Sequence, residues 1–137
     1  MINTIQIALS GLNAASRKVE ASASNIANMQ TMGSLENPEA APYTPLATQQ
    51  TALTDGQGNG LGVKSDFIPK PQPFTPAYAP DSPFANAQGL VGAPNVDLAE
   101  EAVNLSIAKT AYKANVAVIK TTEDMTDELL SVFDRKV

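Results

Sequence analysis

The sequence predicts a mainly α fold, in which long N- and C-terminal helices form a coiled-coil-like pair and a Pro/Gly-rich middle contains a small β-hairpin and an extended strap. All ten prolines lie between Pro38 and Pro94, and seven of the eight glycines lie between residues 33 and 95. Both ends lack proline and space their apolar residues as amphipathic helices do. We expect a helix with its terminal turn over residues 1–32, an outer segment with short strands over 33–95, and a second helix over 96–137.

The composition favours a part of an assembly over a self-contained catalyst. The chain has 137 residues and a formal charge of -5, and hydrophobic residues make up 43% of it but aromatic residues only 5%. A globule of this size usually buries more large apolar side chains to offset its chain entropy. We therefore expect the chain to complete its core with neighbouring molecules.

Several classes of site are excluded by what the sequence lacks. It has no cysteine and no histidine, so Cys/His zinc sites, thiolate–imidazole pairs and the usual base of a nucleophilic serine are missing. Lysine and arginine form no run, which argues against nucleic-acid binding. No apolar stretch is long enough to span a bilayer, and the segment before Arg17, which has no basic residue, makes a poor cleavable signal peptide. We expect no catalytic residue, metal, cofactor or small-molecule substrate.

The first predicted helix runs from about Asn3 to Asn28. Its apolar and small residues recur at alternating intervals of three and four, a heptad pattern that presents one narrow stripe to a partner helix. The stripe either packs on the chain's own domain or forms an intermolecular coiled coil, and the spacing favours neither. It consists of Ile2, Ile5, Leu9, Leu12, Ser16, Val19, Ala23 and Ile26, of which Ile5, Leu9, Leu12, Val19 and Ile26 are the candidate assembly contacts.

Asparagine recurs at Asn25 and Asn28, where this helix is expected to end. Asparagine tolerates a left-handed backbone and bonds readily to nearby main chain. From these residues alone, a helix cap followed by a turn is the favoured interpretation.

The first part of the middle segment predicts a loose β-hairpin. Residues 43–53 and 61–68 alternate imperfectly between apolar and polar and would form its two strands. Glycine occupies every second position from Gly56 to Gly62, which indicates a flexible turn. No Gly-Lys-Ser/Thr sequence follows, so a phosphate-binding loop is not indicated.

Residues Lys70 to Phe84 predict an extended strap. Its prolines fix φ and remove amide donors, which disfavours a helix or a central strand. Phe74, Tyr78 and Phe84 could pin this strap onto a helix. A proline-motif ligand for an aromatic groove is the less favoured alternative, because no PxxP core has a basic flank.

The second predicted helix begins after Asp97 and continues to about Phe133. Asp97 and Glu100 have the spacing of a capping box, and no proline or glycine interrupts the residues that follow. At 1.5 Å per residue this helix is roughly 55 Å long. Its two apolar stripes fit either burial between the first helix and the strap or contact with subunits on both sides. One stripe holds Leu98, Leu105, Tyr112, Val116, Ile119, Leu130 and Phe133, and the other holds Val103, Ile107, Ala114, Val118, Met125 and Val132.

The acidic run of Glu123, Asp124, Asp127 and Glu128 is expected to be a solvated face, with metal binding as a less favoured alternative.

Several short motifs occur in a fixed order along the chain. The first is Ser24-Asn25-Ile26-Ala27-Asn28 with Thr31 three positions on, and Pro42-Tyr43 and Tyr78-Ala79-Pro80 follow. Together they resemble the flagellar axial protein family, and most closely its proximal rod proteins of the C type. The C-terminal signature of that family is matched by Asn95, Val96, Asp97, Glu101, Asn104, Tyr112 and Asn115, and Leu105, Ile119 and Leu130 are further candidate contacts of the second helix.

The resemblance implies how such a chain is used. Family members form an inner coiled-coil tube from their terminal helices, here residues 1–32 and 96–137, and place the middle segment outside it. The resemblance also implies export through the flagellar type III apparatus without a cleaved signal peptide, and a rod that crosses the periplasm and transmits torque from motor to hook. The implied partners are copies of the chain, other rod proteins and the export apparatus, with the inner-membrane ring as a further candidate.

Folding coupled to assembly is the mechanism that these features suggest. Two apolar helices with little core of their own would be partly disordered in the monomer and would become ordered when neighbours bury their stripes. The alternatives are another axial protein of the same apparatus, or a self-contained helical binding or secretion-needle-like module. A two-carboxylate glycosidase is supported only by the supply of acidic residues.

Overall fold

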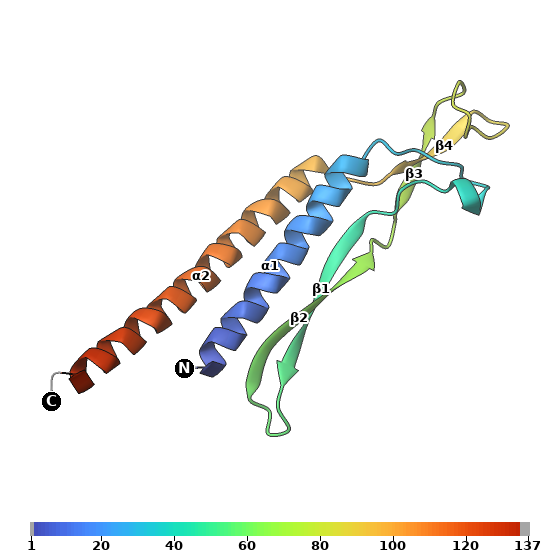
Figure 1. The fold of residues 1–137 in the computed structure, drawn as a ribbon. Coiled ribbons are helices and arrows are strands. Elements are labelled where there is room, and N and C mark those ends of the chain that lie inside the picture. Colours follow the sequence, from blue (N-terminus) through green and yellow to red (C-terminus); the bar gives the residue numbers. More distant parts are fainter. Residues whose placement is uncertain (1, 135–137) are drawn as a thin grey trace.

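The computed structural model describes residues 2–134, which form an elongated molecule of two long helices and two β-hairpins (Figure 1). Within these residues, no helix has both the length and the apolarity that crossing a bilayer requires. The helices are α1 (Ile2–Asn28) and α2 (Leu98–Asp134), the strands are β1 (Leu46–Thr54), β2 (Gly60–Pro69), β3 (Phe74–Tyr78) and β4 (Leu90–Pro94), and a 3-10 helix, η1 (Pro38–Ala40), precedes the strands.

Helix α1 is the central layer of the molecule, with α2 packed on one side and the β1–β2 hairpin on another (Figure 1). The helices are antiparallel, because Gly11 lies against Asn115 while Asn25 bonds to Glu101. Both contacts pair residues whose numbers add to 126, so the last ten or so residues of α2 project past the start of α1. The helix covered on two sides is thus α1. Burial of α2 between the first helix and the strap, one of the two expectations, is wrong.

The seam between the two helices is built from small and polar residues. Ala8, Ala15 and Ser22 of α1 and Ala108 of α2 are almost fully buried there. Apart from prolines, the fully buried apolar side chains of residues 2–134 are five alanines and Val91. Alanine removes little apolar area from water, so the seam allows a close approach of the helices but contributes little hydrophobic stabilisation.

The β1–β2 hairpin confirms the hairpin expected in the middle segment, although β1 is shorter and β2 is longer than the expected strand. The strands are antiparallel, with Leu46 opposite Pro69. The hairpin docks on α1 through Ser10, whose hydroxyl oxygen accepts the main-chain N–H of Val63 at 3.1 Å. Gly62 has a φ of 114°, and any side chain there would collide with Ser10. Glycine at this position therefore permits the close contact between the hairpin and the helix.

The strap expectation is partly wrong, because β3 and β4 form a second antiparallel hairpin. Pro76 lies within β3, opposite Gly92, and is tolerated because both strands of a two-stranded sheet are edge strands. The aromatic residues do not pin this segment to a helix: Tyr78 is 74% exposed, and neither β3 nor β4 packs extensively on α1 or α2. A two-way main-chain bridge between Gly33 and Gly92 ties the second hairpin to the segment that follows α1.

The fold is therefore mixed α/β, and the expectation of a mainly α fold is only partly supported. The paired terminal helices have 27 and 37 residues, as the sequence led us to expect. Four strands of nine, ten, five and five residues accompany them. The strand content was underestimated because β3 lies in the proline-rich segment, where a strand was not expected.

Candidate functional site

The end of α1, the start of β1 and the first turns of α2 meet at a buried polar cluster, the Asn25 lock, which comprises Asn25, Tyr43, Leu46, Lys70 and Glu101. Asn25 is 1% exposed. Its amide nitrogen donates to the Leu46 carbonyl and to Glu101 Oε1, both at 2.8 Å. Its amide oxygen accepts the Leu46 N–H at 2.8 Å and the Tyr43 hydroxyl at 3.1 Å. Both donors and both acceptor positions of the asparagine amide are thus used, and the side chain pairs with Leu46 as a neighbouring strand would.

An ion pair joins the Asn25 lock to α2. Lys70 Nζ lies 3.2 Å from Glu101 Oε1 and 3.0 Å from Glu100 Oε1, and the Glu101 side chain is 1% exposed. Burial alone would raise the pKa of Glu101, but hydrogen bonds from Ser22, Asn25 and Lys70, with the charge of Lys70, lower it below its ordinary value. Burial alone would lower the pKa of Lys70, but its two carboxylate partners raise it. Both groups therefore stay charged at neutral pH, and each charge is compensated.

The remaining motif residues, from the run Ser24-Asn25-Ile26-Ala27-Asn28 and Thr31, close the end of α1. Asn28 is the last helical residue, and its amide donates to the Ser24 carbonyl at 3.0 Å. The Ser24 hydroxyl bonds to the Tyr43 hydroxyl at 2.8 Å, and the Thr31 N–H donates to the Asn28 carbonyl at 3.0 Å. The turn uses no left-handed asparagine, since no non-glycine residue of the described chain has a positive φ. The motif is therefore a helix end and also a fastening for β1 and α2.

Asp97 caps α2 as its position in the sequence predicts. Its Oδ1 accepts main-chain N–H groups of the first turn, the closer at 2.8 Å. The reciprocal half of the capping box is replaced, because the Glu100 side chain bonds to Lys70 instead. Before the helix, the Asn95 amide donates to the Gln72 carbonyl at 3.1 Å, and Val96 is half-buried.

The predicted contacts of α1 do not point at α2 but form a stripe beside the seam. Leu9 and Val19 are 52% and 40% exposed, and Ile5, Leu12 and Ile26 are half-buried. At 100° per residue, this stripe lies about a quarter turn from the seam, on the side away from the β1–β2 hairpin. The fold therefore leaves this stripe free to contact another molecule, although α2 of the same chain packs beside it.

The predicted residues of α2 divide between the seam and its two flanks. Asn104 and Asn115 are half-buried in the seam. The stripe that contains Ile107 lies on the flank facing the β1–β2 hairpin, where Ile107 lines a groove with Thr48 and Gln50. The other stripe must lie on the opposite flank, next to the apolar stripe of α1. On that flank Leu105 and Ile119 are half-buried and Tyr112 is 45% exposed, while Leu130, 59% exposed, lies on the projecting end of α2.

Two stripes from different helices thus form one continuous surface, which we call the apolar face. It brings together eight of the predicted assembly residues, although their sequence positions span more than a hundred residues. Its members are Ile5, Leu9, Leu12, Val19 and Ile26 of α1 and Leu105, Tyr112 and Ile119 of α2.

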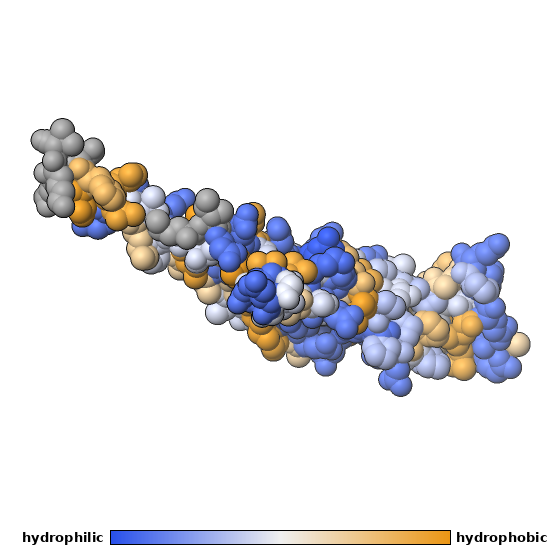
Figure 2. Space-filling view, turned by 90° about the horizontal axis from the view of Figure 1, so that it is seen from below, coloured by the Kyte–Doolittle hydropathy of each residue, from blue (hydrophilic) through white to orange (hydrophobic). Residues whose placement is uncertain are grey.

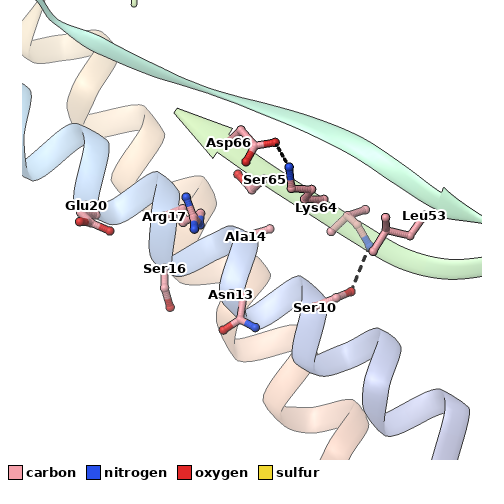
Figure 3. Close-up of a pocket in the computed structure, with 11 residues that line it drawn as sticks. Ser10, Asn13, Ala14, Ser16, Arg17, Glu20, Leu53, Lys64, Ser65 and Asp66 are labelled. Atoms are coloured by element: carbon pink, nitrogen blue, oxygen red, sulfur yellow. Dashed lines mark hydrogen bonds and ion pairs between the residues drawn. The ribbon is translucent and has the colours of Figure 1, made fainter. Parts of the chain in front are cut away.

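An open pocket of about 390 Å³ lies between α1 and β2 (Figure 3). In it Ser10 bonds to the β2 main chain, and Lys64 pairs with Asp66 at 2.8 Å. Arg17, on its wall, lies over the Phe67 ring at 5.2 Å from the centroid. These groups join the hairpin to the helix, and the serines have no histidine to act as their base. The pocket therefore offers no recognisable nucleophile–base pair.

Sequence reasoning missed Tyr43 as a partner of Asn25 and Lys70 as a partner of Glu101, because nothing local marks residues that meet only through the fold. A usable signal did exist for the seam. Ala8, Gly11, Ala15, Ser22 and Asn25 keep the same three–four spacing as the apolar stripe, offset by one position from much of it. Small residues at heptad spacing indicate a close helix pair as validly as large ones do.

Two family models match the chain at its two helical ends. "Flagella basal body rod protein" matches residues 5–33, which include Asn25, and "Flagellar basal body rod FlgEFG protein C-terminal" matches residues 87–132, which include Glu101. The flagellar basal-body rod protein FlgC of Yersinia enterocolitica is 37% identical over 126 residues, covering 91% of this chain and 92% of the relative. FlgC of Salmonella typhimurium is 36% identical over 127 residues with the same coverage, and FlgC of Bacillus subtilis is 29% identical over 145 residues, covering 95% and 96%. The chain therefore belongs to the FlgC family of flagellar basal-body rod proteins, as a structural subunit of the flagellar basal body and not an enzyme.

Proposed function

We propose that the chain assembles into the proximal rod through the apolar face of its helix pair, with copies of itself and with other rod proteins as neighbours. The observation that carries this proposal is an inversion of the usual burial pattern. The fully buried apolar side chains of the helices are alanines, whereas Leu9, Val19 and Tyr112 of the apolar face are 52%, 40% and 45% exposed. Hydrophobic side chains are visible at the surface of the narrow end in Figure 2. Large apolar surfaces of this kind usually meet a partner.

Assembly supplies the hydrophobic burial that the monomer lacks. Fully burying one leucine or valine side chain contributes about 1.5–3 kcal/mol, so the apolar face can contribute far more than the alanine seam. Helix ends that the Asn25 lock does not hold become fully ordered only when neighbours cover them. This coupling makes the free subunit easy to unfold and the assembled rod stiff.

The terminal helices form the inner tube of the rod in this proposal, and the two hairpins form its outer part. The rod crosses the periplasm and carries torque from motor to hook. The subunit reaches it through the flagellar type III apparatus without cleavage of a signal peptide. The shallow core supports this route, because a chain that buries mainly alanine costs little to unfold for threading. The family relationship supports the destination.

Charged substitutions on the apolar face test the proposal. We expect Leu9→Asp, Leu12→Asp and Ile119→Asp each to reduce incorporation into purified basal bodies at least about tenfold, because a charge buried between helices is strongly unfavourable. Export should be unchanged, since it uses the unfolded chain. The measurements are immunoblots of basal bodies and of secreted protein in cells that express only the variant.

Matched controls are available on the same helices. Asn13→Asp on α1 and Thr110→Asp on α2 introduce the same charge at exposed positions outside the apolar face, and both should incorporate normally. Leu9 is the sharpest test, because it is 52% exposed and its substitution should not disturb the monomer. Normal incorporation of all three apolar-face variants would contradict the proposal.

A further inference from the structure

The outer side of α2 carries charged residues that the fold leaves unpaired. Lys109, Lys113 and Lys120 occupy its middle, and all three are exposed. They recur at 100° per residue on one side of the helix, well away from the seam with α1. No acidic residue lies between Glu101 and Glu123 in the sequence. The middle of α2 is therefore a purely basic strip on an otherwise acidic protein.

The same side of α2 becomes acidic toward its end. Glu123, Asp124, Asp127 and Glu128 are all exposed, and Asp127 and Glu128 lie where α2 projects past α1. Among residues 3–133, the only ion pairs are those of Lys64 and Lys70, so no charge of either group has an ionic partner within this range. We call the basic and acidic groups together the charged strip.

The spacing within the charged strip is regular. Each lysine is followed fourteen residues later by an acidic residue, because Glu123 follows Lys109, Asp127 follows Lys113 and Asp134 follows Lys120. Fourteen residues are two heptads, which return to nearly the same side of a helix and advance along it by about 21 Å. A second, parallel α2 displaced by this distance would place Glu123 level with Lys109 and Asp127 level with Lys113.

We propose that the charged strip is a docking surface for α2 of a second copy of this chain, parallel to the first and displaced by two heptads. The inference rests on the proposed function, because subunits of a rod that share one axial direction present parallel helices to one another. Aligned without displacement, the strips would set lysine against lysine and carboxylate against carboxylate, which is repulsive. The charges therefore select the axial offset between neighbours, while the apolar residues supply most of the attraction.

An antiparallel pair is the competing arrangement, and the sequence distinguishes it. Antiparallel strips would set Lys109 against Asp127 and Lys113 against Glu123. Such a pair is a closed two-fold dimer that uses the strip of both copies and cannot continue along a rod. The two arrangements thus predict different residue pairs, which lie one helical turn apart.

Cysteine pairs test the proposal directly, because the natural chain has no cysteine. In basal bodies from cells that express only the variant, oxidised Lys109→Cys/Glu123→Cys should form disulfide-linked dimers and longer multimers. Lys109→Cys/Asp127→Cys should form at least about tenfold fewer. The two cysteines of one chain cannot join, since both pairs are separated by about 20 Å or more along one helix and a disulfide needs Cα atoms within about 7 Å.

The outcomes separate this inference from the proposed function. Incorporated protein without a crosslink, a stronger 109–127 product, or a crosslink to a different rod protein each overturns the inference, while incorporation itself still supports a rod subunit. Failure of the natural chain to appear in basal bodies would overturn the proposed function instead.

Charge exchange gives a second test that needs no crosslink. We expect Lys109→Glu/Lys113→Glu and Glu123→Lys/Asp127→Lys each to reduce incorporation about tenfold. The combined fourfold variant should restore it, because every copy then carries the strip with its signs exchanged. Circular dichroism of each purified variant checks that the monomer is unchanged. Loss of incorporation that the combined variant does not restore overturns the inference.

Discussion

Asn25 binds two chemically different partners at once, a main-chain unit and a carboxylate, and this explains why an amide occupies the position. Aspartate would keep the acceptor bonds to Leu46 and Tyr43 but lose both donors, and would set a second carboxylate against Glu101. Aspartate and asparagine are nearly equal in size, so Asn25→Asp would act through charge and hydrogen bonding. One side chain therefore couples three elements that lie far apart in sequence.

Glu101 makes the Asn25 lock sensitive to acid. Its folded pKa is lowered, so its contribution to stability is present above its unfolded pKa, near 4.5, and is lost as the pH falls through the lower folded value. We expect the thermal midpoint of the purified chain to fall as the pH decreases below about 4.5. The Glu101→Gln variant should be less stable at neutral pH but lose less on acidification, because it has no charge there to lose.

Circular dichroism melts of both proteins between about pH 3 and pH 7 check this expectation. The comparison removes the contribution of the other carboxylates, which titrate in both proteins. An identical pH dependence in the two proteins would show that Glu101 is not the group responsible.

The sequence allowed us to predict that the Ser24–Asn28 region ends a helix, because asparagine and serine bond to local main chain. It did not reveal that Asn25 also pairs with β1 and that Lys70 neutralises Glu101. Those partners come from positions 46, 70 and 101, and only the completed fold brings them together. Local hydrogen bonding can be read from spacing, whereas a buried ion pair between distant segments cannot.

At the scale of the element, the two sides of α1 carry side chains of different size and make different contacts. The small side chains meet α2, and the large ones form the apolar face.

The helix bounds were predictable to within a residue or two, because Asp97 caps α2 and the proline-free ends have clear periodicity. The orientation of α1 was not predictable, since a stripe of large residues looks the same whether its partner is in the same chain or in another. The second hairpin was missed because Pro76 argues against a strand unless both strands are edges.

Gly11 should be the least replaceable residue of the seam. A Cβ built there would lie 2.6 Å from the side-chain amide of Asn115, so a larger side chain must push the helices apart. We expect Gly11→Leu to destabilise the monomer by about 1–3 kcal/mol through overpacking. Asn115→Ala should restore part of that loss by opening space opposite. Urea unfolding followed by helical circular dichroism measures each value.

Asn13→Leu is the matched control for Gly11→Leu. It adds the same side chain two residues away on the same helix, at an exposed position outside the seam. Its effect on stability should be within about 0.5 kcal/mol, as for most surface changes. Equal losses for the two variants would mean that close approach at Gly11 does not govern the pairing of α1 and α2.

At the scale of the whole molecule, the stabilising contacts are concentrated at one end. The Asn25 lock, the cap of α2 and the Gly33–Gly92 bridge all lie where the helices meet the hairpins. Toward the other end the helices share only a seam of small and polar residues, and the final turns of α2 extend beyond α1. Such an uneven distribution predicts local opening at the far end well below the cost of complete unfolding.

Hydrogen exchange should reveal this gradient. In the purified monomer, we expect amides of residues 20–28 and 98–108 to be protected more strongly than those of residues 2–10 and 122–134. In basal bodies the two outer ranges should gain protection, because neighbouring helices then cover them. Mass spectrometry of deuterium uptake resolves these segments. Uniform protection along α2 in the monomer would contradict the coupling of order to assembly.

The crossing at Gly33 and Gly92 has a mechanical consequence. Their main chains bond in both directions, at 3.0 and 2.8 Å, and Pro42 lies so close that a side chain on either glycine would collide with it. Strand β4 therefore cannot slide past the segment that follows α1 without breaking two hydrogen bonds and displacing the ring of Pro42. A twisting force applied to the β3–β4 hairpin is therefore transmitted to the C-terminal end of α1 and to the N-terminal end of α2 together. The β3–β4 hairpin therefore moves with these helix ends as one rigid unit and does not bend independently of them.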